Sequence, residues 1–418
     1  MIKLLMIADD FTGALDTGIQ FAKNGVNTQV FTTCDLDSVV VKPETEVVVV
    51  DSETRPLKPY EAYEVVKKIA LWGKNNSVEI IFKKTDSALR GNIGAELQAL
   101  SDIENKSVFF LPEYPSINRI TKNGIHYIEG ELLENSVFGK DPFEPVKKSY
   151  IPDIIKEQSD ISVVCLKTDE KIPKTLNEPS ILVFDAQTIN DLSQRVDDIV
   201  ETKNLKYIAG CAGLAEQIVN KIKFENSERK HFEKTEKLYI ACGSLNDITK
   251  KQVGYAIKKG EFYCQNLTLE QKLMPSYYDT ENGKYFLNYI CENLKSSKKF
   301  IVDTFDKNNS SSEKDEFLKQ NNLSYADIRT IIPKCHSIII NHILSVEDDI
   351  TILMTGGDTL MGFMNLVGCN EIQPLCELEQ GVVISNINVK GRSLQVISKS
   401  GGFGTEDIFL RIANKILK

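Results

Sequence analysis

Short apolar runs, each followed by a turn and a helical pattern, recur through the first half of the sequence. The runs lie at residues 3–8, 46–50 and 78–83, and the helices expected after them span about 12–23, 60–72 and 92–100. A run too short for a helix that leads through a turn into a helix is typical of a βα unit on a parallel sheet. With further strands expected at 181–184 and 206–209, the first half predicts one α/β domain.

The second half begins another set of strand, turn and helix patterns. A charge-dense segment at 221–237 precedes an expected strand at 238–241. The 418 residues are enough for two domains of ordinary size. We therefore expect an α/β chain with two domains, 1–230 and 237–418, each with a largely parallel sheet flanked by helices. A polar stretch at 308–322 is expected to be a surface loop of the second domain.

Residues 112–145 differ from the rest of the first half. The stretch is rich in Pro, Gly and Tyr and has no clear period. It is too long to be a plain connector, and long segments of this kind often carry function. We expect a functional insertion here, or a lid over a pocket, and the sequence leaves open whether it moves.

Charge and composition exclude several classes of protein. The formal charge of -9 argues against a nucleic-acid-binding surface, because phosphate contacts require a basic stripe. The nine cysteines include no C-x-x-C pair and the four histidines lack the spacing of metal ligands, so we expect reduced thiols and no metal site. No apolar run approaches the roughly 20 residues of a membrane span. These features favour a cytoplasmic protein without nucleic-acid or membrane partners.

The turn after the first expected strand carries two adjacent carboxylates, Asp9 and Asp10, before Thr12 and Gly13. In open α/β sheets ligands bind at the carboxyl ends of the strands, so residues of these turns are candidates for a site. A helix N-cap also explains an aspartate here, because it satisfies free N–H groups and suits the helix dipole. Capping needs one carboxylate, and the other is left for a substrate hydroxyl group.

Two further turns of the first domain carry cations. Arg55 can bind a carboxylate with two parallel hydrogen bonds, although most arginines lie in solvent or in surface ion pairs. The third turn contains, within eight residues, Lys83, Lys84, Asp86 and Arg90. A basic pair beside an acid at the start of a helix suits an anionic substrate whose hydroxyl group must lose a proton. The alternative is an exposed charged loop.

Three turns of the second domain are rich in glycine. Each follows an expected strand, and they lie at 242–247, 355–359 and 399–405. Glycine lets the backbone approach a ligand closely and present its N–H groups to phosphate oxygens at a helix start. One such turn is a common connection between a strand and the next helix, whereas three in one domain favour a phosphate site. The sequence has no Walker P-loop and no G-x-G-x-x-G that opens a helix with an acid about 20 residues on.

Six motifs, in order along the chain, resemble those of the four-carbon acid sugar kinase family. They lie at 8–14 with Asp16, at 84–87 with 89–92, and at 141–143, 243–244, 355–359 and 399–404. The resemblance runs nearly end to end. The Lys84-Thr85-Asp86-Ser87 form of the second motif is more similar to threonate and erythronate kinases than to 3-oxo-tetronate kinases. Asn118 stands where relatives often carry Gly, and Cys211 where they often carry Ser.

The resemblance implies a sugar-acid-binding domain at 1–230, an ATP-binding domain at 237–418 and an active site in the cleft between them. It implies ATP-dependent phosphorylation of D-threonate or D-erythronate at the terminal 4-hydroxyl group, with Mg²⁺ carried by the ATP. The implied partners are a small-molecule sugar acid and ATP, and a homo-oligomer stays open. The alternatives are a 3-oxo-tetronate 4-kinase, a non-catalytic sensor of a sugar acid and a nucleotide, and a dehydrogenase of hydroxy acids, which lacks its dinucleotide fingerprint.

The expected site residues fall into three groups. The catalytic candidates are Asp10 and Asp86, either of which can orient and deprotonate the attacking hydroxyl group. The sugar acid is expected to contact Asp10, Arg55, Lys84, Thr85, Asp86, Ser87 and Arg90. ATP and its magnesium-bound phosphates are expected to contact Ser244, Gly356, Gly357, Asp358, Thr359, Gly401 and Gly402.

Overall fold

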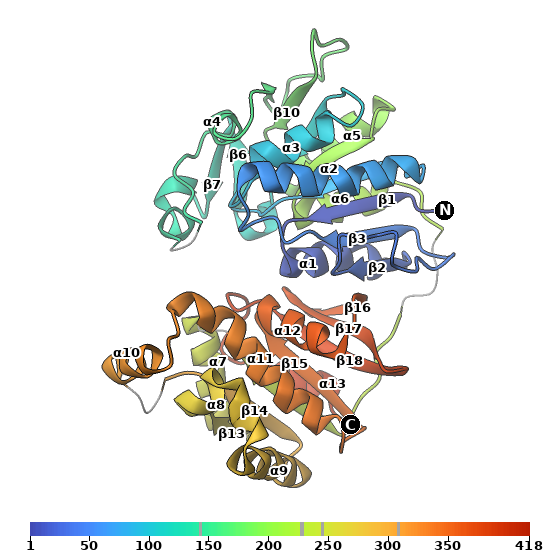
Figure 1. Cartoon of the computed structure of the whole chain (residues 1–418). Helices are drawn as coiled ribbons and strands as arrows, with labels where there is room; N and C mark the ends of the chain where they lie inside the picture. Colours follow the sequence, from blue (N-terminus) through green and yellow to red (C-terminus); the bar gives the residue numbers. More distant parts are fainter. Residues whose placement is uncertain (142–143, 226–229, 244–245, 307–309) are drawn as a thin grey trace. The chain divides into compact units, whose positions relative to one another are not determined.

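The computed structural model describes residues 1–141, 144–225, 230–243, 246–306 and 310–418, and the chain divides into two compact units (Figure 1). Unit 1 comprises Met1–Arg229 and unit 2 comprises Lys230–Lys418. Each unit is an α/β fold with a largely parallel sheet, as the sequence predicts. Within the described ranges, none of the helices combines the length and the apolar character needed to cross a bilayer.

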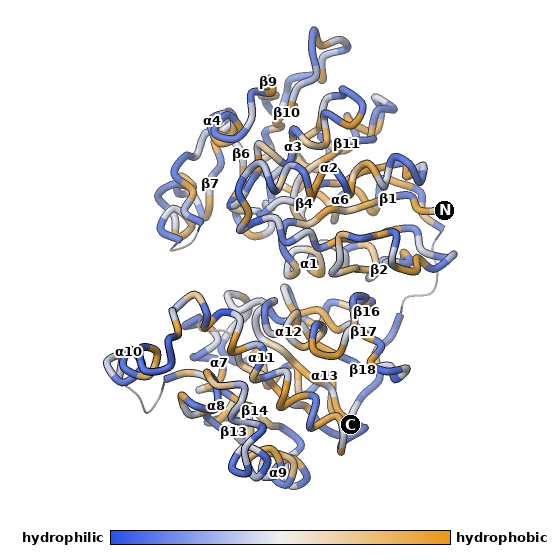
Figure 2. Tube along the Cα trace, viewed as in Figure 1, coloured by the Kyte–Doolittle hydropathy of each residue, from blue (hydrophilic) through white to orange (hydrophobic). Residues whose placement is uncertain are grey.

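The sheet of unit 1 is parallel throughout. Its central strand, β1 (Leu4–Ala8), lies between β3 (Val47–Asp51) and β4 (Ile80–Lys84). From edge to edge the order is β2 (Thr28–Phe31), β3, β1, β4, β11 (Tyr207–Gly210), β5 (Val108–Leu111), β10 (Ser180–Phe184) and β9 (Ser162–Leu166). Strands covered on both faces are apolar throughout, and Figure 2 shows β1 as a continuous hydrophobic stretch.

Helices cover both faces of this sheet. On one face α6 (Ala212–Lys221) packs between α1 (Phe11–Ala22) and α5 (Ile189–Glu201). On the other face α3 (Ile93–Ser101) packs against α2 (Pro59–Asn75) and α4 (Ile151–Lys156) (Figure 1). The three helices expected after the first apolar runs are therefore present, and Gly25, with φ +82°, follows the end of α1.

The insertion, residues 112–145, contains a small antiparallel sheet rather than irregular chain. β6 (Arg119–Lys122), β7 (Ile125–Ile128) and β8 (Glu131–Leu132) form it. Asn123-Gly124 joins the first two strands, and both residues have positive φ, as a two-residue hairpin turn requires. Asn118 also has a positive φ, +55°, which asparagine tolerates better than most residues, so it can stand where relatives often carry Gly.

The sheet of unit 2 is parallel in its first five strands and antiparallel at one edge. The order is β13 (Tyr263–Asn266), β14 (Lys299–Asp303), β12 (Lys237–Cys242), β15 (Ile350–Thr355), β18 (Arg392–Lys399), β17 (Val382–Val389) and β16 (Glu371–Glu379). One face carries α11 (Tyr325–Ile343) packed on α12 (Gly357–Val367), α8 (Leu269–Leu273) and α9 (Glu281–Ser296). The other carries α7 (Asp247–Lys259) and α13 (Ile408–Ile416), which pack on each other.

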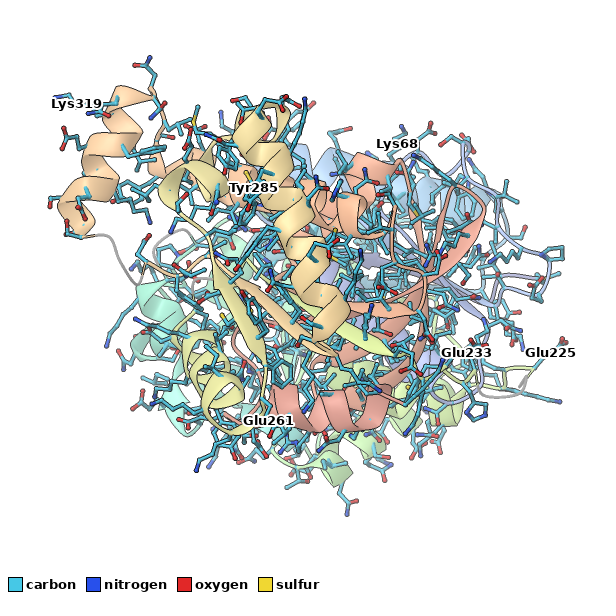
Figure 3. The ribbon with its side chains drawn as sticks, turned by 90° about the horizontal axis from the view of Figure 1, so that it is seen from below. Lys68, Glu225, Glu233, Glu261, Tyr285 and Lys319 are labelled. Atoms are coloured by element: carbon cyan, nitrogen blue, oxygen red, sulfur yellow. The ribbon has the colours of Figure 1, made fainter. Side chains whose placement is uncertain are left out.

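The expectation of a surface loop at 308–322 is wrong for most of that stretch. α10 (Ser311–Gln320) begins with a capping box between Ser310 and Glu313. Leu318 is the buried residue of this helix. The sequence therefore shows almost none of the apolar periodicity that predicts an amphipathic helix. Figure 3 shows Lys319 projecting from the outer side of α10. Positions 308–309 lie outside the described residues.

Candidate active site

The three charged turns of unit 1 lie together because the strands before them end level with one another. Ala8, the last residue of β1, pairs with Asp51 of β3 and with Lys84 of β4. The chain passes from β3 on one side of β1 to β4 on the other, which makes this edge the switch point where α/β sheets bind ligands. The candidate residues that follow these strands therefore meet.

Arg55 and Lys84 form ion pairs with the aspartates of the first turn. Arg55 Nε donates to Asp9 Oδ2 at 2.8 Å, and Arg55 Nη2 lies 2.8 Å from Asp10 Oδ1. Lys84 Nζ lies 3.2 Å from Asp9 Oδ1 and 3.3 Å from Asp10 Oδ1. Arg55 Nη2 also lies 3.7 Å from Asp86 Oδ1. Two cations thus join three carboxylates into one cluster.

The ion pairs fix the charge states of this cluster. Burial by itself would raise the pKa of Asp9, but Arg55 and Lys84 outweigh burial and hold this pKa well below its ordinary value. Burial would lower the pKa of Lys84, yet Asp9 and Asp10 raise it. The same aspartates raise the pKa of Arg55 against the effect of burial. These three groups therefore stay ionised at neutral pH.

The two adjacent aspartates have different surroundings. Asp10 is the N-cap of α1, and its Oδ1 accepts from the Gly13 N–H at 3.0 Å. Asp9 is the carboxylate that capping leaves over, and it is buried with one oxygen bonded to Arg55 and the other to Lys84. The contacts of Asp10 with described residues all use Oδ1, and its side chain is 28% exposed. Asp10 Oδ2 is therefore available to a ligand.

Arg90 holds Asp86 with two parallel hydrogen bonds. Arg90 Nε donates to Asp86 Oδ2 at 2.8 Å and Arg90 Nη2 donates to Asp86 Oδ1 at 3.1 Å. Burial would raise the pKa of Asp86, but Arg90 and Arg55 hold it well below its ordinary value. Asp141 of the insertion accepts from Arg90 Nη1 at 3.1 Å. Asp86 is thus better suited to fix Arg90 than to accept a proton.

Lys83 faces away from the cluster although Lys84 belongs to it. Successive side chains of a strand point to opposite faces of the sheet. Lys83 Nζ lies 3.1 Å from Glu96 Oε2 of α3 and donates to the Lys84 carbonyl at 2.7 Å. Glu96 also accepts from the Thr54 hydroxyl group, next to Arg55. The two lysines of the expected basic pair therefore point to opposite faces of the sheet. Lys83 contacts Glu96 and the Lys84 carbonyl, and only Lys84 contacts the aspartates of the cluster.

The remaining predicted residues of unit 1 lie in the third turn. Thr85 is buried, with its N–H bonded to the carbonyl of Gly210. The Ser87 hydroxyl group accepts from Arg119 Nη1, at the start of β6. The Arg119 guanidinium lies 5.0 Å from the ring centroid of Phe138 in the insertion. The insertion therefore adds a guanidinium and an aromatic ring to the site.

A buried histidine ties the insertion to the same turn. His126 Nε2 lies 3.1 Å from the Ser87 carbonyl oxygen, and His126 Nδ1 lies 3.1 Å from Thr121 Oγ1. Burial lowers the pKa of His126 from 6.5 to about 4. The ring is therefore neutral at pH 7, with Nε2–H donating to the carbonyl and Nδ1 accepting from the threonine.

We expect His126→Gln to reduce the loss of stability in acid. The pKa of His126 is about 4 in the folded chain and near 6.5 in the unfolded chain, so the unfolded state takes up the proton first. The stabilisation that neutral His126 gives the folded chain is present above about pH 6.5 and is lost as the pH falls toward 4. The loss is about 3 kcal/mol, at 1.4 kcal/mol per pH unit. Urea unfolding from pH 7 to 4 measures it, with the exposed His231→Gln as control. Equal pH slopes for the wild type and His126→Gln would contradict this account.

The glycine turns of unit 2 meet in the same way as the charged turns of unit 1. Cys242 of β12 pairs with Thr355 of β15, and Thr355 pairs with Lys399 of β18. The Gly356 N–H donates to the Lys399 carbonyl at 2.9 Å, so two of the turns are bonded directly. A Cβ atom on Gly243 would collide with the Thr359 hydroxyl group, so the turn at 242–247 closely approaches the turn at 355–359.

The predicted residues around α12 divide into two sets. Gly356 is the N-cap of α12 with φ +86°, a conformation that favours glycine, and Gly357 and Asp358 form the first turn. The Asp358 side chain is exposed and lies 3.1 Å from Arg329 of α11. The Thr359 hydroxyl group is buried and donates to the Thr355 carbonyl, so it faces inward. Ser244 lies outside the described residues, as do Pro142 and Phe143 of the motif at 141–143.

Side chains bind four carbonyl groups of the glycine loop, residues 400–404. The bonds run from Lys399 Nζ to Ser400 O at 2.9 Å, from Thr249 Oγ1 to Gly401 O at 3.0 Å, and from Gln252 Nε2 to Phe403 O at 3.0 Å and Gly404 O at 2.9 Å. Thr249 and Gln252 belong to α7, so two side chains of this helix hold three of these carbonyls.

Several backbone N–H groups of the glycine loop point the other way, although the Phe403 N–H donates to the Ser400 carbonyl. The C=O of a trans peptide and the N–H that follows it are antiparallel, so the N–H groups of residues 401, 402, 404 and 405 face away from the bound carbonyls. Among the described residues, the nearest atom to a Cβ on Gly402 would be Asn246 Nδ2 at 3.9 Å. A loop that presents several backbone N–H groups is suited to bind phosphate.

Sequence reasoning assigned no role to several residues of these sites. Arg119 and Asp141 stand in or beside the family motifs, so the resemblance could have suggested them. His126 and Gln252 stand in no such motif. Their contacts depend on the packing of β7 and α7, which the local sequence does not specify.

Two families of domains match the chain. Residues 4–218 match a family described as a sugar-binding N-terminal domain. Residues 239–409 match a family described as a nucleotide-binding C-terminal domain. The charged turns lie within the first match and the glycine turns within the second.

Several relatives are named as kinases. The D-threonate kinase of Salmonella typhimurium is 24% identical over 419 residues, which cover 97% of this chain and 96% of the relative. The D-erythronate kinase of Heliobacterium modesticaldum is 30% identical over 205 residues, 46% of this chain and 47% of the relative. The 3-oxo-tetronate kinase of Escherichia coli is 30% identical over 165 residues, 38% of this chain and 42% of the relative.

Two solved structures share the fold. A protein of Salmonella typhimurium LT2 has a TM-score of 0.81 and 18% identity, with all of both chains covered. A protein of Haemophilus influenzae has a TM-score of 0.73 and 20% identity, with 99% of this chain and 100% of the other covered. At these identities the likeness establishes the fold alone.

Proposed function

Because the chain belongs to the four-carbon acid sugar kinase family, we propose that it phosphorylates D-threonate or D-erythronate at the 4-hydroxyl group with ATP. Kinase activity on four-carbon acid sugars is common to the named relatives. The observation that carries the proposal for this chain is the ionised cluster after β1, β3 and β4. It offers an accessible carboxylate, Asp10, held by Arg55 and Lys84.

Asp10 is the group that we propose to accept the proton of the 4-hydroxyl group. In phosphoryl transfer the protein mainly positions the reactants and neutralises charge. The substrate oxygen would lose its proton to Asp10 Oδ2, bond to the terminal phosphorus of ATP, and displace ADP. Asp86 is the weaker candidate, since taking a proton there would break its paired hydrogen bonds with Arg90.

The other residues of the cluster would orient the sugar acid. Lys84 and Arg55 fix the position of Asp10, while Arg90 and the rest of the third turn would face the remaining hydroxyl groups. The contacts that support this arrangement are the ion pairs of Asp86 with Arg90 and Arg55, and the bond between Ser87 and Arg119. These substrate contacts are the ones to examine by mutation.

The ATP phosphates would bind where the glycine turns converge. The N–H groups of the glycine loop and of Gly357, in the first turn of α12, suit phosphate oxygens, whereas the Gly356 N–H is already bonded to the Lys399 carbonyl. Ser244 adjoins the same turns in sequence and keeps its predicted role. Mg²⁺ carried with ATP would neutralise phosphate charge during transfer.

We expect Gln252→Met to weaken ATP binding. Without the amide donors, the Phe403 and Gly404 carbonyls are free to turn, and the N–H groups that we assign to phosphate lose their orientation. The KM for ATP should rise about tenfold, the effect of losing roughly 1.4 kcal/mol. The KM for the sugar acid should stay within twofold. Steady-state kinetics measures both, with the exposed Lys251→Met of α7 as control. A change in both KM values alike would argue against the assigned role.

A coupled ATP-consumption screen tests the proposed function. The substrates are D- and L-threonate, D- and L-erythronate and the 3-oxo tetronates, with the position of the phosphate read by NMR. Sustained ADP release with D-threonate or D-erythronate, and a 4-phosphate product, is the expected result. Preference for a 3-oxo tetronate would favour the alternative kinase, which the Escherichia coli relative represents. Binding of a sugar acid and ATP without ADP release would favour a sensor.

Location and assembly complete the proposal. The cysteines are all free, as in proteins of reducing compartments, and ATP is available in the cytoplasm, where we place the protein. A sugar acid and ATP are the partners proposed, and a homo-oligomer stays open. Gel filtration with light scattering would determine the assembly.

A further inference from the structure

Most cations of the unit 1 site are already bound to carboxylates of the protein. Arg55 contacts Asp9, Asp10 and Asp86, and Lys84 contacts Asp9 and Asp10. Arg90 contacts Asp86 and Asp141. A substrate carboxylate would have to compete with these buried or half-buried acids for each of the three cations. The carboxylate of a sugar acid therefore needs another partner.

Arg119 differs from these cations in its contacts. Within the described part of the chain it has no carboxylate partner: its guanidinium donates to the Ser87 hydroxyl group and stacks on the Phe138 ring. Arg119 is half-buried, and a guanidinium 5.0 Å from a ring centroid is within the range of a cation–π contact. A guanidinium carries five N–H donors, so the bond to Ser87 leaves enough of them for a carboxylate.

A chain of contacts connects Arg119 with Asp10. Arg90 lies 5.1 Å from the same Phe138 ring that Arg119 contacts. Arg90 holds Asp86, which lies 3.7 Å from Arg55 Nη2, and the same atom lies 2.8 Å from Asp10. A continuous series of side-chain contacts thus joins Arg119 to Asp10 within unit 1.

From these contacts we infer that Arg119 binds the carboxylate of the sugar acid and so selects acids over neutral polyols. The inference rests on the proposed function and assigns one end of its substrate. A four-carbon sugar acid has its carboxylate and its 4-hydroxyl group at opposite ends. Arg119 anchors the first end with paired hydrogen bonds, and Asp10 receives the second. The insertion, which supplies Arg119 and Phe138, then determines specificity.

Binding and turnover of matched ligands test this inference. Calorimetric titration without ATP measures the Kd of D-threonate and D-erythronate, and of the tetritols threitol and erythritol, for the wild type, Arg119→Gln and Arg119→Lys. Arg119→Gln should weaken binding of the better acid by roughly 30- to 100-fold, as expected for losing a charged hydrogen-bonded pair. Arg119→Lys should recover part of this, because it keeps the charge without the planar fork. The KM for ATP should stay within twofold.

The outcomes separate this inference from the kinase proposal. If the preference for the acid over the tetritol is smaller in Arg119→Gln than in the wild type, the inference is supported. This holds even if the wild type consumes no ATP, because then only the kinase proposal fails. Unchanged acid binding in Arg119→Gln overturns the inference while leaving the kinase proposal in place. An equal loss of acid and tetritol binding also overturns it, since a general disturbance of the site would cause that. If Arg119→Gln does not fold, Arg119→Lys with wild-type affinity for both classes would overturn it.

Discussion

Replacing Asp10 with asparagine is expected to lower kcat for the accepted sugar acid by roughly 10²- to 10⁴-fold, the range that general base catalysis contributes. Asparagine caps helices about as well as aspartate, so the bond to the Gly13 N–H and the start of α1 should persist. The variant removes the negative charge and the proton-accepting oxygen while keeping the shape. Steady-state ADP release gives kcat and both KM values, and thermal unfolding checks the fold.

Two further variants identify the source of the effect. Asp160→Asn removes an exposed carboxylate from the same unit and should leave kcat unchanged. Asp86→Asn should raise the KM for the sugar acid more than it lowers kcat, because it releases Arg90 rather than the proton acceptor. A large loss of kcat in Asp86→Asn, with near wild-type kcat in Asp10→Asn, would transfer the role of base to Asp86. Near wild-type turnover in both would remove the base assignment altogether.

Replacing Arg55 with methionine is expected to destabilise unit 1 by about 3 kcal/mol at pH 7, the lower end of the cost of removing a partner from a buried charge, because Lys84 stays beside Asp9 and Asp10. Asp9 is 1% exposed and takes a 2.8 Å hydrogen bond from Arg55. Methionine fills a similar volume without charge, so the loss reports the ion pairs more than packing. Trp72 of α2 is the only tryptophan of the chain, and its fluorescence in urea follows unit 1 by itself. Lys106→Met, at an exposed lysine of the same unit, is the control.

The pH dependence of this difference has a definite sign. The pKa of Asp9 is depressed in the folded chain, so its contribution is present above the unfolded value near 3.8 and is lost as the pH falls through the folded value. The difference in the free energy of unfolding between the wild type and Arg55→Met should therefore be constant near neutral pH and shrink below about pH 4. A gap that widens in acid would show that the ion pairs with Asp9 are not its cause.

The sequence determined the βα units well because their signal is local. Apolar strands, helical periods and glycine stops lie within a few residues of one another, and β1, α1, α2 and α3 form where these signals stand. The hairpin of the insertion also has a local signal, Asn123-Gly124, although the segment as a whole has no clear period. α10 carried little signal, since a polar helix on the surface has almost no apolar period.

Side-chain partners were decided by the tertiary structure. The sequence pattern places Asp9 and Asp10 in the same turn, and Lys83 and Lys84 side by side as a basic pair. The alternation of the strand sends Lys83 to Glu96 and Lys84 to the aspartates, and burial separates Asp9 from the helix cap at Asp10. Residues far apart in sequence, such as Ser87 and Arg119, meet only when strands and insertion pack. The motifs predict where a ligand would bind because strand ends are read from local sequence, whereas the pairing of charges depends on contacts between distant segments.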